Sequence, residues 1–293
     1  MHILSARRTL SIVVVSIGFI VACEIPVAPD DEHHDEHPED YGYSVVNGDF
    51  TVRESVQIRR MNELRVRYIT GDLIFDLEWW ASEFEARIDH LRYIEGSLDL
   101  RPSGDRIVLV DLPALDSVEG GVFIQDNANF ESLVAPELHH IRHVLRIENN
   151  DSIETIHLPN LSHAPNLIFE GNANLADIEL PGTRWAHSLQ IRDSPELRSL
   201  SVPVLEEIEE FGFVMERNES LDSFHLPALK TIHGDLLIQD NQVLETIEFA
   251  VLEQVSGDFQ VIDNPNLPTS NAQQLANQVE VTGDTTISGN ATD

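Results

Sequence analysis

An apolar pattern that recurs every 22 to 26 residues constrains the fold of this chain more than any other feature of its sequence. The repeats align on a polar residue, with apolar residues five and three positions before it and three, six and eight positions after it. Spacings of two and three residues are typical of short strands separated by bends, whereas an amphipathic helix has a period of 3.6. The aligned polar residues are Asn127, Asn150, Asn172, Ser194, Asn218, Asn241, Asn264 and Asn290.

One repeat unit is too small to bury its own apolar residues, so neighbouring units have to stack and share a core. Three earlier units, which contain Phe50, Leu73 and Leu98, extend the pattern back to about residue 46. Prolines such as Pro159 follow the last strand position of several units, where a fixed φ and a missing N–H suit a corner. We therefore expect residues 46–293 to form one all-β solenoid, β-helix-like or leucine-rich-repeat-like, of about 10–11 turns.

The repeat breaks near the C-terminus. Thr269 or Ser270 is suited to cap a short helix that carries Ala272 and Leu275 on one face, and a last strand around Thr286 follows. This pattern predicts a short capping helix over the final turn.

Three tryptophans, Trp79, Trp80 and Trp185, are large aromatic residues away from the core positions of the repeat. Exposed aromatic residues are frequent contact anchors, so these three are the candidates for partner binding. The alternative is that Trp185 replaces a missing core leucine and that Trp80 belongs to a cap. The segment from Glu78 to Tyr93 fits either a helix or the solenoid register with two inserted residues.

The repeated asparagines are predicted to form a structural ladder, because a side-chain amide can both donate and accept hydrogen bonds at a buried bend. The members of this ladder are Asn127, Asn150, Asn172, Asn218, Asn241 and Asn264. The alternative is a row of calcium or sugar ligands that includes Asp126, Asp193, Asp240 and Asp263. The glycine–aspartate nonapeptide pattern of calcium-binding β-rolls is lacking, which favours the ladder.

The first residues have the order of an export signal, with Arg7 and Arg8 before an apolar run that is short for a membrane span. The run ends in Ile20-Val21-Ala22-Cys23, which resembles the lipobox of bacterial lipoproteins. This resemblance implies that residues 1–22 are a signal peptide, that Cys23 carries a lipid, and that a membrane is one partner of the chain. The alternative is a plain secretory signal with an incidental cysteine.

Residues 23–45 are rich in acidic residues, proline and histidine, which predicts a disordered tether. Its histidines, His33, His34 and His37, could bind a metal only weakly without fixed geometry, so we expect no functional metal site. The net charge of −33 argues against a nucleic-acid partner, and charged partners should be cationic. Because the chain has a single cysteine, it cannot form an internal disulfide, and its stability must come from the packed core.

The unit at residues 232–241, followed by Leu244 and Ile247, resembles the receptor L-domain repeats, which are relatives of leucine-rich repeats found in insulin-receptor and growth-factor-receptor ectodomains. The resemblance covers about residues 46–290. It implies a solenoid that binds partners through a sheet face or its loops, and it implies no particular ligand. The disulfide-rich modules and the transmembrane helix of the animal receptors are missing.

We expect a non-catalytic lipoprotein of the bacterial cell envelope, periplasmic or surface-exposed, that displays a recognition or adhesion surface for a protein or glycan and uses no cofactor. One alternative is a structural spacer without a specific ligand. Another is a carbohydrate-active β-helix enzyme with stacked carboxylates such as Asp126, Glu148 and Glu170. A recognition module should show a contiguous aromatic or apolar area on one face, and a spacer should not.

Overall fold

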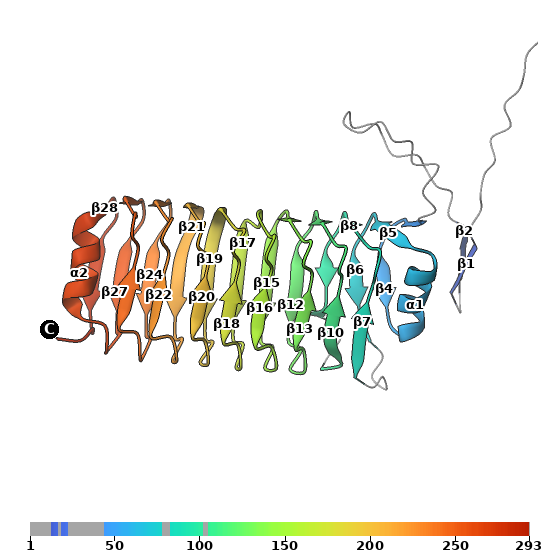
Figure 1. Ribbon diagram of the computed structural model, residues 1–293, viewed down its shortest axis with the longest axis horizontal. Helices are drawn as coiled ribbons and strands as arrows, with labels where there is room; N and C mark the ends of the chain where they lie inside the picture. Colours follow the sequence, from blue (N-terminus) through green and yellow to red (C-terminus); the bar gives the residue numbers. More distant parts are fainter. Residues whose placement is uncertain (1–12, 17–18, 23–43, 78–82, 102–104, 293) are drawn as a thin grey trace, which may run out of the picture.

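The computed structural model describes residues 13–16, 19–22, 44–77, 83–101 and 105–292. Most of this chain forms one elongated parallel β-solenoid in which each turn stacks on the turn before it (Figure 1). Strands make up 42% of the structure and helices 8%, so the predicted all-β solenoid with a short helix near the C-terminus is confirmed. Two strands near the N-terminus, β1 (Val13–Ser16) and β2 (Phe19–Ala22), pair antiparallel.

Each turn of the solenoid contributes strands to three faces, which we call the first, long and third faces in chain order. The long face is a continuous parallel sheet. Its strands are β4 (Phe50–Val52), β6 (Leu73–Phe75), β9 (Leu98–Asp99), β12 (Val122–Gln125), β15 (Val144–Glu148), β17 (Asn166–Glu170), β19 (Trp185–Arg192), β21 (Glu207–Glu216), β24 (Leu236–Gln239), β27 (Phe259–Ile262) and β29 (Thr285–Ser288).

The first face consists of shorter strands, and β19 and β21 are long enough to run from this face onto the long face. His163 bridges β14 and β19 through isolated pairs. The other strands of the first face are β3 (Ser44–Val46), β5 (Val66–Ile69), β8 (Tyr93–Ile94), β11 (Ser117–Val118), β14 (His140–Ile141), β23 (Thr231–Ile232), β26 (Gln254–Val255) and β28 (Glu280–Val281).

The third face is divided into three smaller parallel sheets. Its strands are β7 (Phe84–Arg87), β10 (Ile107–Asp111), β13 (Ser132–Val134), β16 (Thr155–His157), β18 (Asp177–Glu179), β20 (Ser199–Ser201), β22 (Ser223–His225) and β25 (Thr246–Glu248).

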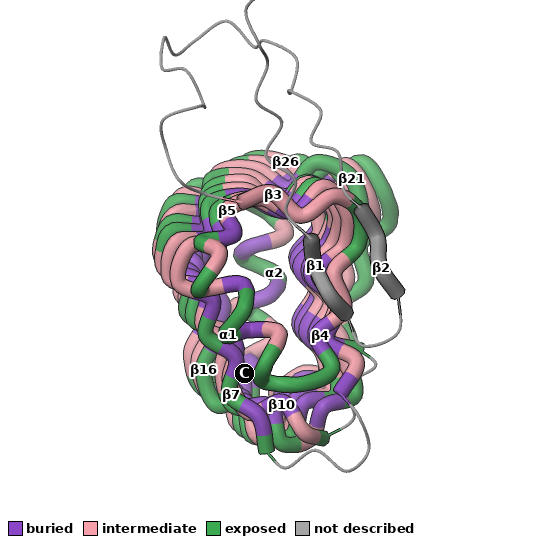
Figure 2. Tube along the Cα trace, turned by 90° about the vertical axis from the view of Figure 1, so that its right-hand side faces the viewer, coloured by how far each residue is buried: buried purple, intermediate pink, exposed green. Residues whose placement is uncertain are grey.

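The alternation of side chains explains why these segments are strands. In β12, Val122 and Ile124 point inward and are buried, whereas Phe123 and Gln125 face solvent. The same inward positions recur in every stacked turn, so the core runs along the whole solenoid axis. Figure 2 shows buried residues on the inner side of the coil and exposed residues on its outer side and corners.

Helices cover both ends of the solenoid (Figure 1). At the C-terminal end, α2 (Thr269–Gln278) buries Ala272 and Leu275, as predicted. Its N-cap is Pro268, so neither Thr269 nor Ser270 caps the helix, and that detail of the prediction is wrong. At the N-terminal end, α1 (Ser55–Glu63) was not expected. It buries Ile58 and Met61, whose spacing of three residues places them on one face, and Glu54 and Gln57 form a capping box at its start.

The ambiguous segment between Glu78 and Tyr93 follows the solenoid register where the structure describes it. Residues 84–87 form β7, which pairs with β10 in parallel, and Ile88 and Leu91 are fully buried. The helical alternative is therefore wrong for residues 84–93. Trp79 and Trp80 lie outside the described residues, as do Cys23 and most of the expected tether.

The repeated asparagines lie at the corner between the long and third faces, and all six are fully buried. Asn241 shows how one of them joins two turns. Its Oδ1 accepts a hydrogen bond from the backbone N–H of Asn218 at 3.0 Å, and its Nδ2 donates to the carbonyl oxygen of Met215 at 2.9 Å. Asn264 bonds in the same way to Asn241 and Ile238. Each such amide satisfies backbone groups of the preceding turn.

The residue before the repeated asparagine, or before Ser194 in its place, has a positive φ in most turns, which explains why aspartate recurs at this position. The φ angles are 57° at Asp126, 49° at Asp193, 56° at Asp240 and 54° at Asp263. Asp and Asn are the non-glycine residues that adopt this left-handed conformation most readily. The aspartates are therefore explained by backbone geometry without a ligand.

A second row of polar bonds, which the sequence did not reveal, follows the corner between the first and long faces. Asp235 Oδ1 accepts from the backbone N–H of Asp258 at 2.8 Å, and Asp258 Oδ1 accepts from that of Asp284 at 2.9 Å. A Cβ on Gly257 would lie 2.1 Å from Asp235 Oδ1, so this close stacking requires glycine.

Candidate recognition surface

A row of aromatic side chains follows the solvent-facing position of the first face from turn to turn. Strand register aligns Tyr68 with Tyr93, and His140 with His163 and Trp185, and the buried Ser117 interrupts the row between these two groups. Tyr68 and Tyr93 stack with ring centroids 4.8 Å apart, and His140 and His163 stack at 4.4 Å. The ring of Trp185 meets that of His163 edge to face at 4.2 Å.

The solenoid itself does not require aromatic residues in this row. In the next turns the equivalent positions hold Glu207, Thr231 and Gln254, and the same parallel pairing continues through them. The inward neighbours, such as Ala186 and Ile208, supply the core in all these turns. The rings are therefore a property of the surface, and they stabilise it in part through contact with one another.

Carboxylates flank the row of rings. The hydroxyl of Tyr68 donates to Glu95 Oε1 at 2.8 Å, and Glu119 accepts from Arg142 at 2.7 Å. Burial and a hydrogen bond to Glu119 raise the pKa of Tyr93 to about 12. The hydrogen bond from Arg142 is the main cause that lowers the pKa of Glu119. The polar groups at the Tyr68–Tyr93 end of the row are thus already paired with one another.

The pKa of His163 is lowered, first by burial and then by the neighbouring charges of His140 and His187. Its imidazole therefore resists protonation, which suits a ring stacked between two other aromatic side chains.

The regular strand pairing is interrupted next to Trp185. Ala186 pairs with Ile208 and Ser188 pairs with Gly212, so the single residue His187 lies opposite three residues of β21. These three, Glu209, Glu210 and Phe211, are all exposed and form a bulge at the corner between the first and long faces. Phe211 is 61% exposed, the largest value among the exposed large hydrophobic residues of the described chain.

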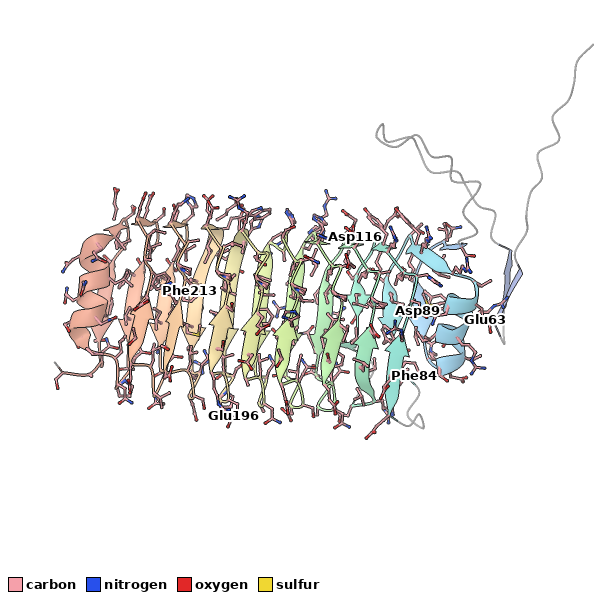
Figure 3. The ribbon with its side chains drawn as sticks, viewed as in Figure 1. Glu63, Phe84, Asp89, Asp116, Glu196 and Phe213 are labelled. Atoms are coloured by element: carbon pink, nitrogen blue, oxygen red, sulfur yellow. The ribbon has the colours of Figure 1, made fainter. Side chains whose placement is uncertain are left out.

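Backbone geometry fixes the end of this bulge. Gly212 has a φ of +80°, and a Cβ there would lie 2.1 Å from the carbonyl oxygen of Asp235. Only glycine can close the bulge in this conformation. The chain then returns to the core at Phe213, which lies within the body of the solenoid, whereas Asp116 and Glu196 mark its opposite edges (Figure 3).

The bulge contacts the end of the aromatic row through His187. His187 Nε2 lies 3.1 Å from Glu209 Oε2, and His187 Nδ1 lies 4.0 Å from Glu210 Oε2. The rings of Trp185 and His187 have centroids 5.7 Å apart. We call the group of Trp185, His187, Glu209, Glu210 and Phe211 the Trp185–Phe211 corner.

No family model, curated protein or solved structure matches this chain. The assignment of a site therefore rests on the chain's own residues and geometry.

Of the predicted partner-binding residues, Trp185 is the one that the structure describes. It lies in the solvent-facing row, and the core position beside it is filled by Ala186, so the alternative that Trp185 replaces a core leucine is wrong. Sequence reasoning missed Phe211. The interval of 24 residues between Ser194 and Asn218, longer than its neighbours, was the available signal of an insertion.

A second surface feature is a shallow depression on the long face, with a volume of about 510 Å³. Phe123, Val144 and Ile168 form its apolar part. Arg101 lies over the ring of Phe123, with its Cζ 4.6 Å from the ring centroid, and also bonds to Asp99 at 2.5 Å. Arg146, at the same depression, bonds to Glu148 at 2.5 Å. Both arginines are therefore already paired.

Stacked carboxylates, a metal cluster and a membrane-spanning helix are three other features that could indicate a function. Glu148 and Glu170 are aligned on adjacent strands, but Glu148 already bonds to Arg146 and Gln125, and Asp126 Oδ1 accepts from Asn149. Within the described residues, no cluster of three His, Cys, Asp or Glu side chains has a geometry that could hold a metal ion. No described helix has the length and apolar character needed to cross a membrane.

Proposed function

We propose that this chain is a non-catalytic lipoprotein of the bacterial cell envelope that recognises a macromolecular partner through the Trp185–Phe211 corner. The lipobox-like end of the first segment supports the anchor at Cys23, and the likeness of the repeats to receptor L-domains supports a binding solenoid. The tether would hold the solenoid away from the membrane surface.

One observation carries the proposal: an aromatic residue that is 61% exposed lies on a bulge beside a row of rings that the solenoid does not need. An exposed phenylalanine keeps apolar surface in water and gains nothing from the core. Burial of such a residue in a partner would recover that free energy, which is why exposed aromatic residues are common at the centres of interfaces. A spacer has no physical need for this feature.

Capture from a detergent extract of the envelope of the source cells tests the proposal. The full chain, Phe211→Ser, Trp185→Ser and the control Val204→Ser are each immobilised, and the retained proteins and glycans are quantified. Val204 is 38% exposed at another corner, so its substitution removes apolar surface away from the proposed site.

We expect a component that the wild type and Val204→Ser retain equally and that Phe211→Ser and Trp185→Ser lose. Circular dichroism of all four proteins checks that they fold alike. The same retained set for all four folded proteins would contradict recognition at this corner.

A further inference from the structure

We propose that the Trp185–Phe211 corner binds a Lys- or Arg-rich segment of a partner protein, with cationic side chains placed against the aromatic rings and beside the carboxylates of Glu209 and Glu210. This inference rests on the proposed recognition function and adds the chemistry of the partner.

The charge distribution favours a cationic partner over an anionic one. After Arg198 the chain contains only two Lys or Arg residues, Arg217 and Lys230, among many Asp and Glu residues. Carboxylates already bind both of them, since Arg217 bonds to Asp193 at 2.5 and 2.8 Å and Lys230 lies 3.1 Å from Glu206. An anionic surface on the partner would be repelled by the excess carboxylates of this half.

The combination of ring and carboxylate is specific for cations. A guanidinium or ammonium group is attracted to the face of Trp or Phe, and a nearby carboxylate adds a charged hydrogen bond. The molecule contains an internal example, because Arg101 lies over Phe123 and bonds to Asp99. The Trp185–Phe211 corner contains both rings and carboxylates. Within this group His187 is the one basic side chain, and it lies beside Glu209 and Trp185.

The shape of the corner favours a polypeptide over a small cation. Small ligands bind in concave sites that surround most of their surface. The bulge projects from the corner, and two depressions of the described chain lie elsewhere, on the long face near Phe123 and along α2. A projecting aromatic residue with adjacent carboxylates fits the surface of a macromolecule that can enclose it.

Fluorescence anisotropy tests the inference with the full chain and a short fluorescein-labelled peptide in which Lys and Arg alternate with Gly and Ser, at physiological salt. The key variant combines Glu209→Gln with Glu210→Gln. The control combines Glu219→Gln with Glu245→Gln, which removes the same charge from exposed positions beyond the opposite corner.

We expect the Glu209/Glu210 variant to weaken peptide binding about tenfold or more, because two close charge contacts are lost. The control should weaken it no more than about twofold, since salt screens distant charges. Phe211→Leu, which keeps apolar volume and removes the ring, should also weaken binding. Equal losses in both double variants, or no loss in either, would overturn the inference, because the attraction would then be diffuse or absent.

The two proposals fail in different ways. If the envelope component is lost by Phe211→Ser but retained by the Glu209/Glu210 variant, recognition at the corner stands and the cationic partner is excluded. A neutral glycan ligand would give that result. If all variants retain the component, the recognition function itself fails.

Discussion

At the scale of single residues, Asn241 adds side-chain hydrogen bonds to the strand pairing that joins two turns of the solenoid. Its amide accepts from the N–H of Asn218 and donates to the carbonyl of Met215, and both of these backbone groups lie in the preceding turn. With water excluded from this corner, loss of the amide leaves the N–H of Asn218 without this hydrogen bond.

Replacement of Asn241 by Ala should therefore lower the free energy of unfolding by about 1–3 kcal/mol, the cost of buried groups left unsatisfied. Asn241→Asp should also destabilise, because a carboxylate cannot donate to the Met215 carbonyl and carries a buried charge. Gln239→Ala, on the solvent-facing side of β24, should change stability by no more than about 0.5 kcal/mol. Denaturant melts measure all three, and an Asn241→Ala protein as stable as wild type would mean that the ladder is dispensable.

At the scale of elements, the bulge in β21 is separable from the solenoid. The buried residues that flank this corner are Ala186 and Leu189 in β19, and Ile208 and Phe213 in β21, so the interval grows from three residues to five. Other turns use intervals of three and four side by side without loss of pairing in β15 and β17. The stacking of the turns therefore does not require the extra residues in β21.

Deletion of Glu209 and Glu210 should leave the circular dichroism spectrum unchanged and the stability within about 1 kcal/mol of wild type, because the paired segments on both sides remain. The same deletion should abolish capture of the envelope component. A protein that no longer folds would show that the bulge is structural, and the proposal would then depend on Phe211→Ser and Trp185→Ser.

At the scale of the whole molecule, the proposed anchor and the solenoid are independent units. Among the described residues, the hydrophobic core lies between α1 and α2 and is built from residues at position 46 and beyond. A lipid on Cys23 would decide where the protein resides without any effect on how it folds.

Cys23→Ser should therefore move the protein from the membrane fraction to the soluble fraction and leave its melting temperature unchanged. Cell fractionation followed by immunoblotting measures the first effect, and a thermal melt measures the second. Equal membrane partitioning of the two forms would contradict the lipoprotein proposal.

The sequence by itself determined the solenoid, the inward residues of each turn and the C-terminal helix. The reason is that Val122 and Ile124, and their equivalents in every unit, repeat with the period of a strand at a fixed interval, and only stacking buries such a pattern. Asn241 and its equivalents share that register, so their common position was also visible in the sequence.

Only the tertiary structure decided which surface residues lie on the same corner of the solenoid. Trp185 and Phe211 lie in consecutive turns, and whether each points inward or outward depends on how many residues β19 and β21 place between their buried positions. That number is set by pairing with neighbouring strands, because a shift of one residue moves a side chain to the opposite face. Helix α1 was hidden for a similar reason, since Ile58 and Met61 acquire an apolar partner only from the end of the stacked core.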